Sequence, residues 1–172
     1  GEDNVIEYLE TRVVRDNLII EMDEDVKIKS EIPVKVYLQA PNITFVEVSE
    51  SSILSTKSVI RTEKLSIEAT GDSESNFILD VKEFRIRLSG DSKLRATGYA
   101  VKQNIYIEET SKYEASQLKS ENIDISGSGG TEAEILAFDK IFGDLSGASE
   151  CTYFGQPKKV DVITTEAASI LQ

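Results

Sequence analysis

The sequence between residues 65 and 92 contains one pattern twice: Leu65-Ser-Ile-Glu-Ala-Thr-Gly71-Asp-Ser and Phe84-Arg-Ile-Arg-Leu-Ser-Gly90-Asp-Ser. In each copy, apolar and polar residues alternate and then run into a hydroxyl residue and a glycine. The two glycines lie 19 positions apart. Alternation of this kind is typical of β-strands, whose successive side chains point to opposite faces. Its return at a fixed interval predicts a repetitive β structure.

The same frame continues on both sides of this stretch. It reappears at Asn122-Ile-Asp-Ile-Ser-Gly127-Ser and, in a degraded form, at Ile141-Phe-Gly-Asp-Leu-Ser-Gly147-Ala. The residue that ends each copy, which we call the marker, falls at positions 30, 50, 71, 90, 109, 127, 147 and 166, about 19 residues apart. We therefore predict an all-β fold, a parallel β-helix or β-solenoid with about 19–20 residues per coil over residues 26–172.

Stacked coils place equivalent residues above one another at about 4.8 Å, so the repeat predicts columns. One inward column should hold Ile67, Ile86, Ile105, Ile123, Gly143 and Val162. A second should hold Ala69, Leu88, Ile107, Ile125 and Leu145. Mostly hydroxyl residues precede the marker, where each coil should turn a corner: Thr70, Ser89, Glu108, Ser126, Ser146 and Thr165. A second strand per coil is expected around Phe77–Val81, Leu94–Ala96, Tyr113–Ala115 and Glu132–Ile135.

An antiparallel β-sandwich uses the same strands and stays open as the alternative fold. A sandwich, however, gives no reason for isoleucines to align coil after coil, and the sequence favours the solenoid. Residues 1–25 are off the repeat frame and predict two strands that cap the stack, Val5–Leu9 and Val13–Glu21, around a turn at Asp16-Asn17. Pro33 and Pro41 bracket a further predicted strand, Val34–Leu38.

Parts of the chain resemble the head GIN domain family, whose members are described as putative auto-transporter adhesins. The resemblance lies in the run Ala115 to Gly129, in Tyr153-Phe-Gly-Gln-Pro-Lys-Lys-Val160, and in Asp16-Asn-Leu-Ile-Ile20 followed by Pro33-Val-Lys-Val-Tyr37. It implies a right-handed parallel β-helix from the cell envelope or exterior of a Gram-negative bacterium. The Gly-Ile-Asn tripeptide that names the family is absent, and the family provides no catalytic residues to carry over.

Composition excludes several classes of function. The chain has 19 Lys and Arg against 31 Asp and Glu, a net charge of −12 that disfavours nucleic acid and anionic membranes as partners. The absence of His removes Ser-His-Asp catalysis and imidazole-ligated zinc. No run approaches the ~18 apolar residues of a membrane span. Gly1 ahead of an acidic stretch suggests that a signal peptide or lipoprotein leader was removed upstream.

Carboxylates are the remaining source of chemistry. Asp72 and Asp91 stand one coil apart at the same corner, a spacing that fits a glycosidase pair or an all-oxygen calcium site. Both follow a glycine in a turn, where aspartate is favoured for its local hydrogen bonds. We expect a solvated turn with at most weak calcium binding, and we expect no cofactor.

Aromatic residues provide the candidate ligand-binding surface. Tyr99, Tyr106, Tyr113 and Tyr153, with Phe154, could form a strip on which sugars stack. The first functional hypothesis is a non-enzymatic, adhesin-like module that binds a surface glycan or protein, with homo-oligomerisation left open. The alternative is a carbohydrate-active β-helix enzyme that uses Asp and Glu residues. Three or more acids converging on a groove would favour the enzyme.

Overall fold

The computed structural model describes residues 6–23 and 33–172, and the chain divides into two compact units, Gly1–Ala40 and Pro41–Gln172. The smaller unit contains an antiparallel hairpin of β1 (Leu9–Val14) and β2 (Asn17–Met22). Two strands are present as predicted, but the predicted bounds are wrong, because residues 6–8 precede β1 and a turn at Arg15–Asp16 interrupts the range Val13–Glu21. That residues 1–25 cap the coils stays a prediction, and the coil predicted at Val26–Ile28 lies outside the described residues. The predicted strand Val34–Leu38 is wrong, because this segment pairs with no other strand.

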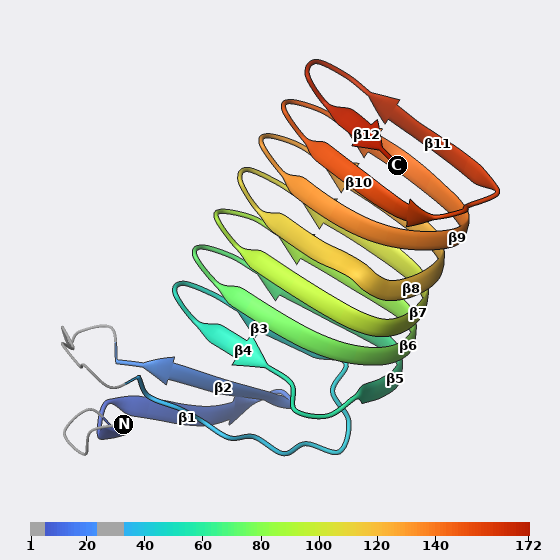
Figure 1. Ribbon diagram of the computed structural model, residues 1–172. Helices are drawn as coiled ribbons and strands as arrows, with labels where there is room; N and C mark the ends of the chain where they lie inside the picture. The colour runs from blue at the N-terminus through green and yellow to red at the C-terminus, as the bar shows by residue number, and fades with distance from the viewer. Residues whose placement is uncertain (1–5, 24–32) are drawn as a thin grey trace. The chain divides into compact units, whose positions relative to one another are not determined.

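The larger unit is a β-solenoid of about seven turns, with parallel strands throughout (Figure 1). A ten-stranded sheet follows the order β12-β10-β9-β8-β7-β6-β5-β3, while β11 pairs with β9 and β4 with β6. The parallel pairing rules out the antiparallel sandwich. The strands are β3 (Phe45–Val48), β4 (Ile53–Ser55), β5 (Ile60–Ala69), β6 (Glu74–Leu88), β7 (Lys93–Ile107), β8 (Lys112–Gly127), β9 (Glu132–Leu145), β10 (Glu150–Gly155), β11 (Lys159–Thr164) and β12 (Ser169–Leu171).

Each coil has two arms that face each other across the core. In β7, residues 93–100 form the first arm after a corner, and residues 102–107 form the second arm before the next corner. Figure 1 shows these coils as flattened loops stacked along one axis. Side chains alternate between core and solvent along both arms, so each arm has an inner and an outer face.

The inward columns are confirmed except in β8, where both shift by two residues. In the second column Gly127, and not the predicted Ile125, lies between Ile107 and Leu145. Ile67 pairs with Ile86, and Ile86 with Ile105, as predicted, and all three are buried. The next partner of Ile105 is Ile125, whereas Ile123 pairs with Gln103 and Ile141. The predicted stack of Ile105 on Ile123 is therefore wrong, although Ile123 is buried as expected.

The corners recur where the sequence predicts them, except in one coil. Left-handed backbone with positive φ occurs at Glu50, Gly71, Gly90, Glu109, Gly129, Gly147 and Glu166. Every described marker is thus confirmed apart from Gly127, which the structure replaces by Gly129 at φ 88°. Gly127 is buried inside the coil, and Ser126 points outward and donates a hydrogen bond to Asp144 Oδ2 at 3.1 Å.

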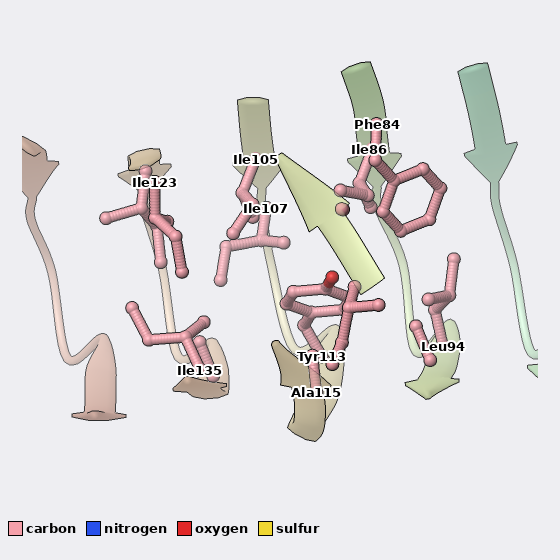
Figure 2. Packing of buried hydrophobic residues seen from close by; sticks show 14 of the residues in the cluster. Phe84, Ile86, Leu94, Ile105, Ile107, Tyr113, Ala115, Ile123 and Ile135 are labelled. Atoms are coloured by element: carbon pink, nitrogen blue, oxygen red, sulfur yellow. The ribbon is translucent and has the colours of Figure 1, made fainter. Parts of the chain in front are cut away.

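The core contains one polar network among its aliphatic side chains. The Tyr113 hydroxyl donates to Gln103 Oε1 at 2.5 Å, and Gln103 Nε2 donates to Ser120 Oγ at 2.6 Å. All three side chains are buried, so these bonds offset the cost of removing polar groups from water. Figure 2 shows Tyr113 within this interior, in the same cluster as Ile105, Ile107 and Leu94.

Candidate functional site

The aromatic candidates do not form one strip. Tyr99 and Tyr106 are exposed by 37% and 45%, but on different arms of β7. Tyr113 is 1% exposed and belongs to the core, so the prediction that it lies on a binding surface is wrong. Tyr153 pairs with Ile135 and packs against the core, half-buried. Of the five candidate rings, Tyr99, Tyr106 and Phe154 are the exposed ones.

A mixed column crosses the outer face of the first arms. Strand pairing aligns Tyr99 with Lys119, Lys119 with Leu136, and Leu136 with Phe154. The Tyr99 hydroxyl donates to Glu121 Oε1 at 2.9 Å, and this hydrogen bond raises the pKa of Tyr99. The column joins two of the candidate rings through an aliphatic side chain, an arrangement that sequence spacing does not reveal.

A shallow hollow of about 130 Å³ lies on the same outer face. The side chains of Glu114, Glu132, Glu134 and Glu150 line it, with Lys112 and Thr152. Lys112 Nζ lies 2.8 Å from Glu132 Oε1, and this bond raises the pKa of Lys112. The predictions from sequence missed the hollow, because only the strand register brings these acids together.

Glu114 is the most enclosed acid of the hollow and is held in its charged form. Its carboxylate lies 2.5 Å from Lys93 Nζ and 2.5 Å from Arg95 Nη2. Burial by itself raises the pKa of Glu114, but the hydrogen bonds from the two cations outweigh burial and leave that pKa below its ordinary value. A catalytic acid needs the opposite shift.

Asp72 and Asp91 lie at adjacent corners and are exposed. The Thr110 hydroxyl donates a hydrogen bond to Asp91 Oδ1. Across residues 6–23 and 33–172, no group of three or more Asp, Glu or Cys side chains is placed to hold a metal ion. The two aspartates thus lie at the corners where the sequence places them, and the hydrogen bond to Asp91 comes from the next coil.

The outer face of the second arms carries cations. Strand pairing aligns Lys64, Glu83 and Lys102 in one column and Glu68, Arg87 and Tyr106 in another. We call Lys64, Glu83, Arg85, Arg87, Lys102 and Tyr106 the basic patch. Glu83 Oε2 lies 3.1 Å from Lys64 Nζ, and Glu83 Oε1 lies 3.3 Å from Arg85 Nη2. The Arg87 guanidinium lies 5.9 Å from the centre of the Tyr106 ring.

The charge state of Glu83 reflects these neighbours. The hydrogen bond from Lys64 lowers the pKa of Glu83, against a smaller opposing effect of burial, and the charges of Lys64, Arg85 and Lys102 lower it further. The sequence analysis did not identify this patch. Its signal was the alternation of Arg85 and Arg87 with Ile86, which places both arginines on the outer face of β6.

The buried thiol of Cys151 is unsuited to act as a nucleophile. Cys151 is the chain's single cysteine and is buried, and burial raises the pKa of its thiol to about 12. The nucleophilic thiolate is therefore scarce at neutral pH.

Comparison with known proteins adds a family and a fold. The family model described as "Putative auto-transporter adhesin, head GIN domain" matches residues 1–157. A crystal structure of a protein described as a putative adhesin from Bacteroides fragilis NCTC 9343 superposes with a TM-score of 0.92 at 17% identity, covering 99% of this chain and 79% of that one. The search of curated proteins finds no significant match. Among the described residues, no helix is long and apolar enough to cross a membrane.

Proposed function

Because the chain belongs to the head GIN domain family, we propose that it is a non-enzymatic, adhesin-like binding module of the cell envelope. Its ligand is a surface glycan or a protein. Its location is the envelope or the exterior of a Gram-negative bacterium, which the family resemblance supports. The adhesin description of the family and of the similar structure supports a role in attachment.

The observation that carries this proposal is the exposure of aromatic rings on regular outer faces. Tyr99 and Phe154 share a column on the first arms, and Tyr106 lies on the second arms beside Arg87. Exposed rings on a rigid scaffold bury large areas at little cost in side-chain entropy, as recognition surfaces require. The parallel ladder provides that rigidity, because each internal coil pairs with a coil on either side.

The hollow favours the carbohydrate-active enzyme as the second candidate, because four glutamates line it. The charge states within it favour binding instead. Glu114 is fixed as a carboxylate by Lys93 and Arg95, and Glu132 is exposed and paired with Lys112. Acid–base hydrolysis of a glycoside needs one carboxyl kept protonated near neutral pH beside a second that is ionised.

A glycan array combined with a panel of envelope proteins tests the binding proposal. We expect the labelled chain to bind at least one ligand, and we expect Tyr99→Ala or Tyr106→Ala to weaken that binding severalfold through the loss of a stacking ring. Tyr37→Ala is the matched control, because Tyr37 is 76% exposed in the other unit. Absence of any ligand, or equal loss in all three variants, would contradict the proposal.

A further inference from the structure

We propose that the basic patch binds an acidic polysaccharide of the uronate class, through its carboxylates and the faces of its sugar rings. This inference rests on the proposed function and specifies its ligand. The patch lies on the outer faces of the second arms of β5, β6 and β7.

The charge of the patch is opposite to that of the chain. Acids outnumber bases by 31 to 19 in the sequence, whereas in the patch Lys64, Arg85 and Lys102 act on the one carboxylate of Glu83, and a fourth cation, Arg87, lies beside Tyr106. Glu68 and Asp124 bound the patch on either side. At physiological salt the Debye length is about 8 Å, so the more distant carboxylates are largely screened, while cations in contact with a ligand are not.

Two of the cations, Arg87 and Lys102, form no ion pair with any carboxylate in the part of the chain that the structure describes. Among residues 6–23 and 33–172, Arg87 is in contact with the ring of Tyr106, and Lys102 acts on Glu83 only through space. Arginine presents a planar fork that matches a carboxylate in a bidentate pair. Arg87 and Lys102 are both exposed, so a ligand carboxylate can reach them without breaking an ion pair.

The geometry matches a chain of sugars rather than a single small anion. Lys64 and Lys102 lie two coils apart in one column, about 10 Å, and Arg85 and Arg87 lie about 7 Å apart on one strand face. Cations spread over such an area can meet charges on neighbouring sugar residues at once. The Tyr106 ring, 45% exposed beside Arg87, provides an apolar surface for a sugar ring.

Titration of the purified chain with oligogalacturonate, followed by calorimetry, tests the assignment. We expect saturable binding that weakens about tenfold in Arg87→Ala and in Lys102→Ala, through the loss of a charge-assisted contact. Lys158→Ala is the matched control, because Lys158 is an exposed lysine between β10 and β11, outside the patch, and it should leave the affinity within about twofold. Tyr106→Phe should retain binding, and Tyr106→Ala should weaken it.

Neutral dextran and dextran sulfate complete the experiment. We expect no binding to neutral dextran and weaker binding to the sulfate, because a sulfate ester spreads its charge over more oxygens and accepts hydrogen bonds less strongly than a carboxylate. Equal affinity for the sulfate, or binding of oligogalacturonate unchanged in Arg87→Ala, would overturn the assignment. If oligogalacturonate fails to bind and the wild type is a dimer that dissociates in Arg87→Ala, the patch is a dimer interface and the assignment is likewise overturned. If oligogalacturonate fails to bind but the array yields another ligand, the proposed function stands and only the assignment of the basic patch fails.

Discussion

At Gly90 the corner depends on a missing side chain. The backbone has φ of 73°, and an added Cβ would lie 2.9 Å from the backbone nitrogen of Gly71 in the coil below. Since both the strain and the contact oppose a side chain, we expect Gly90→Ala to lower the free energy of unfolding by about 1–3 kcal/mol in urea titrations.

Gly130 offers a matched control within the same set of corners. It needs no positive φ, and the nearest atom to an added Cβ is 3.8 Å away. Gly130→Ala should change the free energy of unfolding by less than about 0.5 kcal/mol. If both substitutions lowered the free energy of unfolding equally, the close contact between stacked corners would not be what excludes a side chain at Gly90.

The buried thiol of Cys151 predicts a dependence of stability on pH. Burial raises its pKa from the ordinary 9.0 to about 12, so the folded state holds a proton that the unfolded state releases. The contribution of the thiol to stability is therefore complete below about pH 9 and is lost as the pH rises towards 12. We expect the urea midpoint of the wild type to fall more steeply between pH 8 and pH 10.5 than that of Cys151→Ala.

The buried phenol of Tyr113 has a raised pKa for the same reason and adds an alkaline decline of its own. That decline is common to both proteins, so the difference between them isolates the thiol. Parallel pH curves for the wild type and Cys151→Ala would contradict the prediction.

At the scale of the strand, alternation predicted which residues are buried but not how coils align. Between β7 and β8 the pairing shifts from Arg95–Glu114 to Thr97–Gln117, so one extra residue enters β8. Two further register shifts occur in the pairing of β8 with β9, between Ala115 and Lys119 and between Ser120 and Asn122. Bulges move the register without a marked sequence signal. The predicted partner of Ile105 was wrong by two residues, an even number, so the buried face was still correct.

The inner column of the second arms predicts a severe effect of charge. Ile105 is 1% exposed between Ile86 and Ile125, and Ile105→Asp would place an unpaired carboxylate there. We expect the variant to lose its cooperative thermal transition by circular dichroism, since the cost is several kcal/mol. Ile163→Asp, at a side chain 67% exposed, should melt like the wild type. Melting of Ile105→Asp like the wild type would disprove the register.

The aspartates at two successive corners predict at most weak calcium binding. Asp72 and Asp91 are exposed, and Thr110 already donates to Asp91. We expect millimolar Ca²⁺ to raise the melting temperature by less than about 3 °C, as mass action gives for a weak ligand. A larger shift that Asp91→Asn abolishes would show a genuine site.

For the molecule as a whole, sequence alone predicted the solenoid better than its surface. The repeat supplies strand, corner and core, because these follow from period and alternation. A binding face is assembled across coils, where each register shift changes the neighbours. The column of Tyr99, Lys119 and Leu136 depends on the register shifts around β8. Tyr113, by contrast, pairs with the buried Leu94 ahead of any shift, so its burial follows from the plain repeat.

The arrangement of acids over the described residues predicts binding without turnover. In the hollow, Glu114 has a pKa lowered by Lys93 and Arg95, and at the corners Asp72 and Asp91 are exposed. Because a glycosidase needs a carboxyl that stays protonated, we expect neither reducing ends nor unsaturated uronates to form over a panel of neutral and uronate-rich polysaccharides. The panel includes polygalacturonate, so that cleavage and binding are measured on one polymer. Turnover that Glu134→Gln, Asp72→Asn or Asp91→Asn abolishes would replace the adhesin-like module by the enzyme.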